Sequence, residues 1–262
     1  MVVALDPVAV ELSLELARHV ASSAASELLG LFVEDVRLLE HARTRLALEV
    51  MLSGGSRPLD PAALSGSLRA ESARTRALFE AAAARLGMRG AFEVVRGEPA
   101  AELVRRASTA EALVVGLGGT SRHWQGATVE QLLRAPLPAL LLAREGWSSG
   151  GSVMAVVDDP SAGEPLIAAA ARVAAASGSP LVVLLVGQAR DARTRLALEA
   201  ALPAGATVLV DVASRAFDAQ ALARAARSRG VRLLVMRAEA PSAEDVRELL
   251  VKAPSALLLI RA

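Results

Sequence analysis

The glycine-rich segment 116–128 is the part of the sequence whose residue types best suit a bound anion. It reads GLGGTSRHWQGAT and follows the apolar run 112–115. Glycine lets backbone N–H groups approach a phosphate closely, and the N-terminus of a following helix adds the positive end of its dipole. Thr128 stands three residues before Gln131, which is the spacing of a capping box and predicts that a helix starts there. The plainer alternative is that the glycines serve turns, Thr128 bonds only its own helix, and Arg122 faces water.

Acidic residues follow two other apolar runs. Asp6 comes directly after residues 2–5, and Asp158 with Asp159 comes directly after residues 153–157. Adjacent residues at a strand end point to opposite faces, so Asp158 and Asp159 are poorly placed to share a proton in acid–base catalysis. His123 lies in the glycine-rich segment, but no serine or acid is spaced to form a nucleophilic site with it. With three histidines and no cysteine in the chain, the sequence predicts neither catalytic residues nor a metal site.

The composition excludes several classes of partner. Lysine plus arginine number 29 and aspartate plus glutamate 28, so the formal net charge of +1 provides no strong field for nucleic acid or an acidic membrane. Aromatic residues make up 2% of the chain, which leaves little surface for stacking bases. The longest apolar stretches have about nine residues, whereas a membrane span needs about 20. The N-terminal MVVALD lacks the basic start of a signal peptide, so we expect a cytoplasmic protein.

The chain contains an internal repeat. The octapeptide ARTRLALE occurs at 42–49 and again at 192–199, and similar segments close the two halves, RAPLPALLL at 134–142 and KAPSALLLI at 252–260. Matches in the same order indicate a tandem duplication. The glycine- and serine-rich segment Glu145–Ser152 has the composition of a linker. We therefore expect two domains, residues 1–145 and residues 152–262.

Short apolar runs alternate with long Ala/Leu/Arg segments in each half. This pattern predicts strands at 2–5, 28–33, 91–95, 112–116, 138–143, 153–157, 181–186, 207–211, 232–236 and 256–260. It predicts helices at 8–26, 36–86 (broken at 53–58), 99–108, 128–134, 162–176, 191–201, 217–228 and 242–251. Runs such as 181–186 lack alternation, which is typical of parallel strands buried on both faces. The fold class is therefore α/β, with two tandem doubly wound parallel sheets whose ligands bind at the carboxyl ends of the strands.

The order of these features resembles the universal stress protein family, over nearly the whole chain. The resemblance rests on a first strand that ends in Asp6, a strand ending LFVED, a GEPAAELVRRA helix, the VVGLGG loop and the closing APLPALLLA strand. It implies a Rossmann-like sheet with strand order 3-2-1-4-5, which places Asp6 and Gly116 at one crevice. Nucleotide-binding members of the family hold ATP there, through the Asp, the backbone near the end of strand 2 (here Val33) and a pattern G-x2-G-x9-G-[ST].

The glycine loop of this chain departs from the family pattern. Gly116 and Gly119 fit it, but only six residues separate Gly119 from Gly126, and Ala127 follows where the family has Ser or Thr. Thr128 offers a hydroxyl one position later, in competition with its capping role. Each hydrogen bond lost to a charged group is worth roughly 1.5–3 kcal/mol, so we expect ATP or a related nucleotide to be bound weakly or not at all. The candidate binding residues are Asp6, Val33, Gly116, Gly119, Arg122, Gly126 and Thr128.

The second half offers no such loop. After its fourth strand it reads MRAEAPSAED, without glycine. Ser242 and Asp245 are expected to cap the next helix, and the nearby acids would repel phosphate. Arg237 alone does not reverse this repulsion, and nothing is expected opposite Asp158 and Asp159. The second nucleotide site is therefore predicted to be lost.

The closing strands 139–142 and 256–260 should both lie at sheet edges in the 3-2-1-4-5 order. Exposed apolar edges favour pairing, so we expect the halves to pack as an intramolecular pseudo-dimer through these strands, filled by Ala and Leu. Further homodimerisation stays open.

The leading functional hypothesis is a non-enzymatic tandem universal stress protein of the stress response. The alternative is a scaffold of the same fold that binds no nucleotide and meets an unknown protein partner through its surface, for example the loop containing Arg57. A third class, an enzyme of the related nucleotide-α-hydrolase type, is disfavoured because the sequence 6–9 is DPVA, whereas these enzymes carry a Ser- and Gly-rich pyrophosphate loop there.

Overall fold

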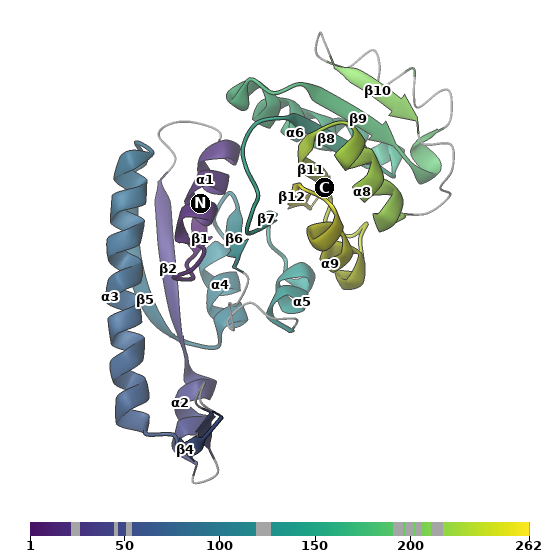
Figure 1. Ribbon diagram of the computed structural model, residues 1–262. Helices are drawn as coiled ribbons and strands as arrows, with labels where there is room; N and C mark the ends of the chain where they lie inside the picture. The colour runs from purple at the N-terminus through teal and green to yellow at the C-terminus, as the bar shows by residue number, and fades with distance from the viewer. Residues whose placement is uncertain are drawn as a thin grey trace.

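A single mixed sheet runs through the molecule (Figure 1). The computed structural model describes residues 1–21, 27–44, 47–50, 54–118, 127–190, 196, 202, 206–210 and 217–261. Within these residues the sheet has ten strands in the order β10-β9-β8-β11-β12-β7-β6-β1-β2-β5. Each half of this order is 3-2-1-4-5 when its own strands are counted along the chain, as predicted.

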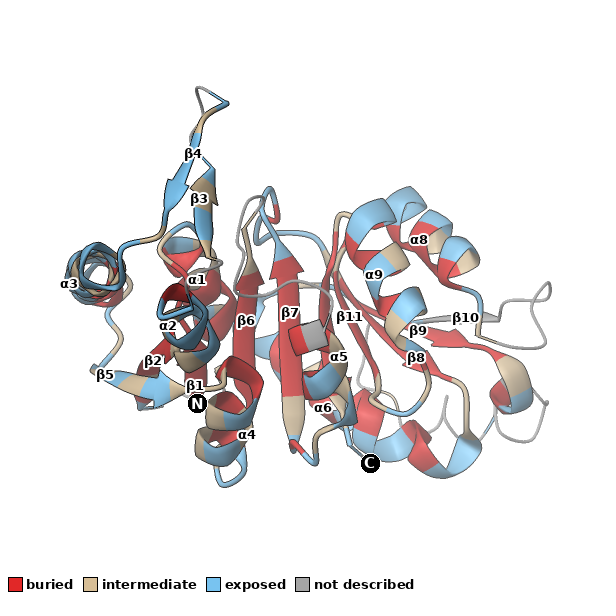
Figure 2. Ribbon diagram, turned by 90° about the horizontal axis from the view of Figure 1, so that it is seen from below, coloured by how far each residue is buried: buried red, intermediate tan, exposed pale blue. Residues whose placement is uncertain are grey.

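The strands of each half pair in parallel. In the first half they are β1 (Val2–Ala4), β2 (Leu28–Asp35), β5 (Gly90–Gly97), β6 (Leu113–Leu117) and β7 (Ala139–Arg144). In the second half they are β8 (Ser152–Val157), β9 (Leu181–Leu185), β10 (Thr207–Val210), β11 (Val231–Arg237) and β12 (Ala256–Ile260). The central strands are apolar at successive positions because both faces are covered by helices, and Figure 2 shows them buried.

The helices divide between the two faces of the sheet. One face carries α1 (Val10–Val20), α3 (Pro61–Arg85) and α6 (Gly163–Ser177), which share a core cluster. The other carries α4 (Pro99–Ala107), α5 (Ala127–Arg134), α8 (Ala219–Ser228) and α9 (Ala243–Lys252). Short 3-10 turns occupy Pro160–Ala162 and Gly187–Arg190. None of the described helices has the length and apolarity that a membrane crossing requires.

The two halves meet through their closing strands. β7 and β12 pair antiparallel, with Leu257 opposite Leu142 and Ile260 opposite Ala139. Across this junction α5 contacts α9 on one face, and α1 contacts α6 on the other. The predicted contact between the closing strands is therefore present, and leucine and alanine form it. It joins the two parallel halves into one sheet.

The predicted helical region 36–86 is wrong in its middle. Helix α2 (Val36–Ala42) is followed by an antiparallel hairpin, β3 (Leu48–Val50) with β4 (Ser56–Pro58), before α3 begins. Asp35 and Asp60 accept backbone N–H bonds at the starts of α2 and α3. The hairpin escaped sequence analysis because its strands have three residues each and are largely exposed. Helix α2 and this hairpin belong to an arm, residues 36–60, and Figure 2 shows β3 and β4 extending from the body of the molecule.

Smaller differences concern element ends. Helix α1 ends at Val20, whereas the sequence predicts a helix over 8–26; residues 22–26 lie outside the described part of the chain, as does nearly all of the predicted helix 191–201.

The linker between the halves is anchored by a tryptophan. The indole N–H of Trp147 donates to the carbonyl oxygen of Arg232 at 2.7 Å. The ring of His19 on α1 meets the Trp147 ring edge-on, with centroids 5.6 Å apart. Burial, assisted by neighbouring Arg18, lowers the pKa of His19.

A glycine is required at the end of the linker. Gly151, at a φ of +126°, passes close to the backbone of Gly230, so a Cβ at residue 151 would lie 2.4 Å from the Gly230 carbonyl oxygen.

Candidate functional site

The carboxyl ends of β1 and β6 bring Asp6 to the crevice expected from the strand order. Ala4 pairs with Val115, so the chain beyond these residues runs side by side in both strands. The Asp6 side chain is buried, and its Oδ1 accepts the backbone N–H of Val8 at 2.9 Å. Its Oδ2 is buried as well and has no hydrogen-bond partner among the described residues. A buried acceptor without a donor is costly, so this oxygen is suited to an incoming N–H or O–H group.

Gly116 lies beside this turn, but it serves packing. Its backbone N–H donates to Ser13 Oγ on α1 at 3.0 Å, in a buried position. A Cβ at Gly116 would lie 2.4 Å from that oxygen and 3.1 Å from the carbonyl oxygen of Ala9. The glycine is therefore explained by the close approach of α1, and its N–H is already used.

Ser13 is a site residue that sequence reasoning missed. It is the hydroxyl in the otherwise apolar buried stripe of α1, which contains Val10, Leu14 and Ala17. A polar residue in such a stripe normally has a specific partner, and this signal could have identified it.

Val33 is not the end of its strand, because β2 continues through Asp35 and pairs with β5 as far as Gly97. It does lie beyond the end of β1. Leu29 donates to the Met1 carbonyl, and Leu31 accepts from Leu5 N–H. Alternate residues turn their peptide groups to the same neighbour, so the Val33 peptide faces the space past Leu5. The Val33 backbone therefore lies at the crevice, as expected, but the predicted strand end at residue 33 is wrong because β2 ends at Asp35.

The remaining predicted residues are only partly described. Thr128 is buried in the first turn of α5, which begins at Ala127, so the prediction that the helix starts at Thr128 is wrong by one residue. Gly119, Arg122 and Gly126 lie outside the described residues. The structure thus brings together Asp6, Val33 and Gly116 at neighbouring strand ends.

Charged groups at the ends of β2 and β5 are already paired. The buried Glu34 carboxylate accepts from Arg96 Nη2 at 2.8 Å and from Nε at 3.1 Å. Arg37 bridges Asp35 and Glu98. Both arginines are therefore paired with carboxylates. The described residues contain no cluster of three or more side chains suited to a metal ion.

The second half places an arginine where the first has Gly116. Val114 pairs with Val3 and Val235 pairs with Ala155, so Gly116 and Arg237 each stand two residues further along. Arg237 Nε and Nη2 donate to the two oxygens of Asp158 at 3.0 and 2.5 Å. This hydrogen bonding raises the pKa of Arg237. The prediction that nothing lies opposite Asp158 is therefore wrong.

Asp159 makes the same local bond that Asp6 makes in the first half, because its side chain accepts the backbone N–H two residues further on. Its Oδ1 accepts from the Ser161 hydroxyl at 2.7 Å and from the Ser161 backbone N–H at 2.9 Å. These bonds, led by the hydroxyl, lower the pKa of Asp159. Asp158 and Asp159 thus both have partners within the chain. Ser242 and Asp245 form the predicted capping box at the start of α9.

Comparison with known proteins shows the fold. No protein-family model and no curated protein matches the chain. A universal stress protein from Archaeoglobus fulgidus DSM 4304 has a similar structure, with a TM-score of 0.69 and 12% identity over 99% of this chain and 98% of that one. A functionally unknown protein from Pseudomonas aeruginosa PAO1 follows, with a TM-score of 0.57 and 15% identity over 99% of this chain and 92% of that one.

The cytoplasmic domain of a prokaryotic cation chloride cotransporter is also similar, with a TM-score of 0.53 and 11% identity over 99% of this chain and 94% of that one. At such identities the likeness concerns the fold alone. The strand order of each half, the helices on both faces and these matches together show that the chain has the α/β, Rossmann-like fold of a universal stress protein along nearly its full length.

Proposed function

We propose that the chain is a non-enzymatic tandem universal stress protein of the cytoplasm that acts in stress response, and that its first half binds ATP or a related nucleotide weakly. The observation that carries the proposal is the buried Asp6 Oδ2, for which the described part of the chain provides no hydrogen-bond donor. Its counterpart in the second half is neutralised by Arg237.

The free carboxylate oxygen of Asp6 is a hydrogen-bond acceptor, which suits the nucleoside part of the ligand. A carboxylate accepts from the exocyclic amino group of a base or from ribose hydroxyls, and it repels phosphate. The Val33 peptide beyond the end of β1 supplies a second, uncharged contact. The residues present therefore fit a nucleoside at the ends of β1 and β2.

The phosphates would depend on the segment that leads into α5. The N-terminus of that helix is an anion-binding position, and Arg122 would add a cation. The Gly116 N–H is occupied by Ser13, and the loop is three residues shorter than the family pattern. Both facts support weak binding.

The non-enzymatic part rests on the absence of an acid–base pair from the described crevices. Asp158 is held by Arg237 and Asp159 by Ser161. One carboxylate oxygen of Asp6 already accepts the backbone N–H of Val8. An isolated carboxylate in this setting binds donors more readily than it catalyses proton transfer.

Titration calorimetry with ATP, AMP and adenosine tests the proposal. We expect a dissociation constant in the range of roughly 0.1–1 mM for ATP, with adenosine retaining most of the affinity because Asp6 contacts the nucleoside. Asp6→Ala should abolish binding, whereas Arg237→Gln in the second half should leave it unchanged. Absence of heat with all three ligands would leave the scaffold function, and release of phosphate or pyrophosphate would contradict the non-enzymatic part.

The scaffold alternative has one observation of its own. The arm formed by residues 36–60 exposes three large apolar side chains, with Leu38 41%, Leu48 59% and Val50 77% accessible. Arg57 on the same arm is paired with Glu49 at 2.7 Å. Leu48 and Val50 stand two residues apart on β3, hence on one face of the strand, and such exposed apolar side chains are typical of protein contacts. Deleting 45–57 should remove a protein partner without altering nucleotide binding.

A further inference from the structure

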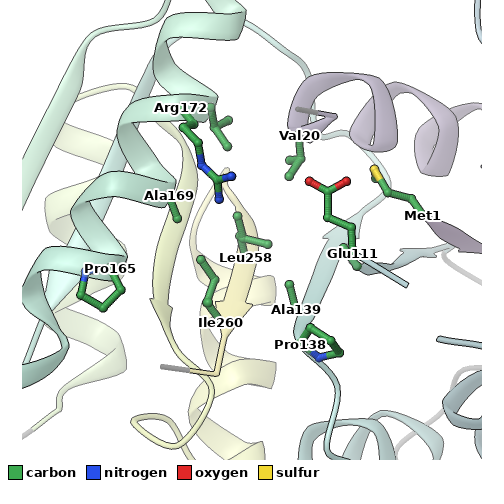
Figure 3. Close-up of a pocket in the computed structure, with 12 residues that line it drawn as sticks. Met1, Val20, Glu111, Pro138, Ala139, Pro165, Ala169, Arg172, Leu258 and Ile260 are labelled. Carbon is green, nitrogen blue, oxygen red and sulfur yellow. The ribbon is translucent and has the colours of Figure 1, made fainter. Parts of the chain in front are cut away.

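A cavity of about 310 Å³ lies at the junction of the two halves, on the face covered by α1 and α6 (Figure 3). Its apolar lining includes Val20, Ala139, Ala169, Val173, Leu258 and Ile260. Its lining contains neither Asp6 nor Gly116, so it is distinct from the candidate nucleotide site. The volume falls at the lower end of the range of small-molecule pockets.

The cavity results from small side chains above the antiparallel strand pair. Ala139 begins β7 and stands opposite Ile260 at the end of β12. Ala169 faces this pair from α6. Larger residues at these positions would fill the space between the helices and the sheet, because protein interiors are normally close-packed.

One charged side chain of each sign stands at the wall of the cavity. Glu111, just before β6, belongs to the first half, and Arg172 on α6 belongs to the second. Figure 3 shows the two side chains reaching toward the same space from opposite walls. Neither makes a hydrogen bond or an ion pair within the described part of the chain. Both residues are exposed to solvent.

We propose that this cavity binds a free α-amino acid with an apolar side chain, such as leucine or phenylalanine. Arg172 would bind the carboxylate, Glu111 the ammonium group, and the side chain would lie against Leu258 and Ile260. A fatty acid or an amine would pair with only one of these two exposed charges and leave the other without a partner. The zwitterion satisfies both and places its apolar part on the apolar floor.

Because Glu111 and Arg172 come from different halves, the ligand would bridge them. Binding should therefore stabilise the association of the halves by mass action. This consequence does not depend on nucleotide binding.

Equilibrium dialysis and saturation-transfer NMR with the full chain test the proposal. Leucine is compared with leucinamide, which lacks the carboxylate, with N-acetyl-leucine, which lacks the ammonium group, and with octanoate. We expect leucine to bind about tenfold or more tightly than each of the others, as expected for one charge-assisted bond. Arg172→Gln should remove the preference over leucinamide, and Glu111→Gln the preference over N-acetyl-leucine.

Ala169→Phe fills the cavity and should abolish binding, whereas Ala168→Phe on the exposed side of the same helix should not. Arg224→Gln, an exposed arginine on α8, is the matched charge control. Circular dichroism establishes that each variant is folded. The proposal is overturned if no apolar amino acid binds at about 10 mM, where a relevant site would be occupied. It is equally overturned if octanoate binds as tightly as leucine, or if Ala169→Phe is folded and binds normally.

Discussion

The two strand-end crevices of this molecule occupy the same place in a repeated sheet and differ in how they treat a carboxylate. In the first, Gly116 packs against α1 and offers Asp6 no side chain, and one buried oxygen of Asp6 has no partner among the described residues. In the second, Arg237 binds both oxygens of Asp158. The second half thus pairs both oxygens of Asp158 within the chain, whereas one oxygen of Asp6 has no partner among the described residues.

This difference has an energetic meaning. A carboxylate buried without a partner lowers stability, and a bidentate arginine recovers most of that loss. On the proposed function, the first crevice gives up stability in order to bind a nucleotide, whereas the second gains stability and binds none. A duplicated fold permits this division, because one copy can stabilise the chain while the other keeps the site.

The largest expected effect concerns the glycine that distinguishes the first crevice. Gly116→Ala places a Cβ 2.4 Å from Ser13 Oγ and 3.1 Å from the Ala9 carbonyl oxygen. Overpacking of this kind should lower the free energy of unfolding by about 1–3 kcal/mol, measured by urea denaturation. Ser13→Ala removes the nearest atom, Ser13 Oγ. The double variant should therefore lose less free energy of unfolding than the sum of the losses in the two single variants. Additive losses would show that the contact does not matter.

The next effect concerns the arginine of the second crevice. Arg237→Gln leaves Asp158, of which 19% is accessible, without its bidentate partner. We expect the free energy of unfolding to fall by about 1–2 kcal/mol, between the values for exposed and buried pairs. Arg134→Gln, which breaks the exposed pair with Glu130 on α5, is the control and should change it by less than about 0.5 kcal/mol. Equal losses in both variants would contradict the comparison.

A smaller effect of opposite sign is expected at Asp6. Asp6→Asn keeps an oxygen for the Val8 N–H and removes the charge that lacks a partner. The free energy of unfolding should rise by about 1 kcal/mol, whereas Asp158→Asn should lower it. Thermal unfolding without ligand measures both. A loss of stability in Asp6→Asn would mean that the Asp6 carboxylate has an internal role.

The smallest effect is a pH dependence at Asp159. Its pKa is lowered by the Ser161 hydroxyl and backbone N–H. The unfolded chain therefore binds this proton more readily, and the stability contributed by the carboxylate is present above its ordinary value of 3.8 and lost as the pH falls through the lowered value. The difference in melting temperature between the native chain and Asp159→Asn should shrink as the pH is lowered through this range. Ser161→Ala removes the main cause of the lowered pKa, so it should make this pH-dependent loss of stability smaller.

Much of the fold could be predicted from residue patterns. Apolar runs without alternation marked the central strands, and the predicted strand order was confirmed in both halves. The hairpin at 48–58 was missed, because three-residue strands with exposed side chains carry no periodic signal. The ends of β2 and α5 were off by one or two residues, as is usual where capping and pairing compete.

The candidate site was less accessible to sequence reasoning. Asp6 and Gly116 were placed correctly at neighbouring strand ends. The role of Ser13 and the pairing of Arg237 with Asp158 were missed, because both join residues more than 75 positions apart. Such contacts depend on which helix face and which strand end meet in space.

The amino-acid sequence alone determined that apolar strands alternate with helices, that the unit is repeated, and that one copy has a glycine loop, because periodicity and composition are local properties. Only the tertiary structure decided which carboxylate keeps an oxygen without a partner, and where small residues leave a cavity between the halves. These outcomes depend on distances between segments remote in the chain, which packing sets and local patterns do not encode.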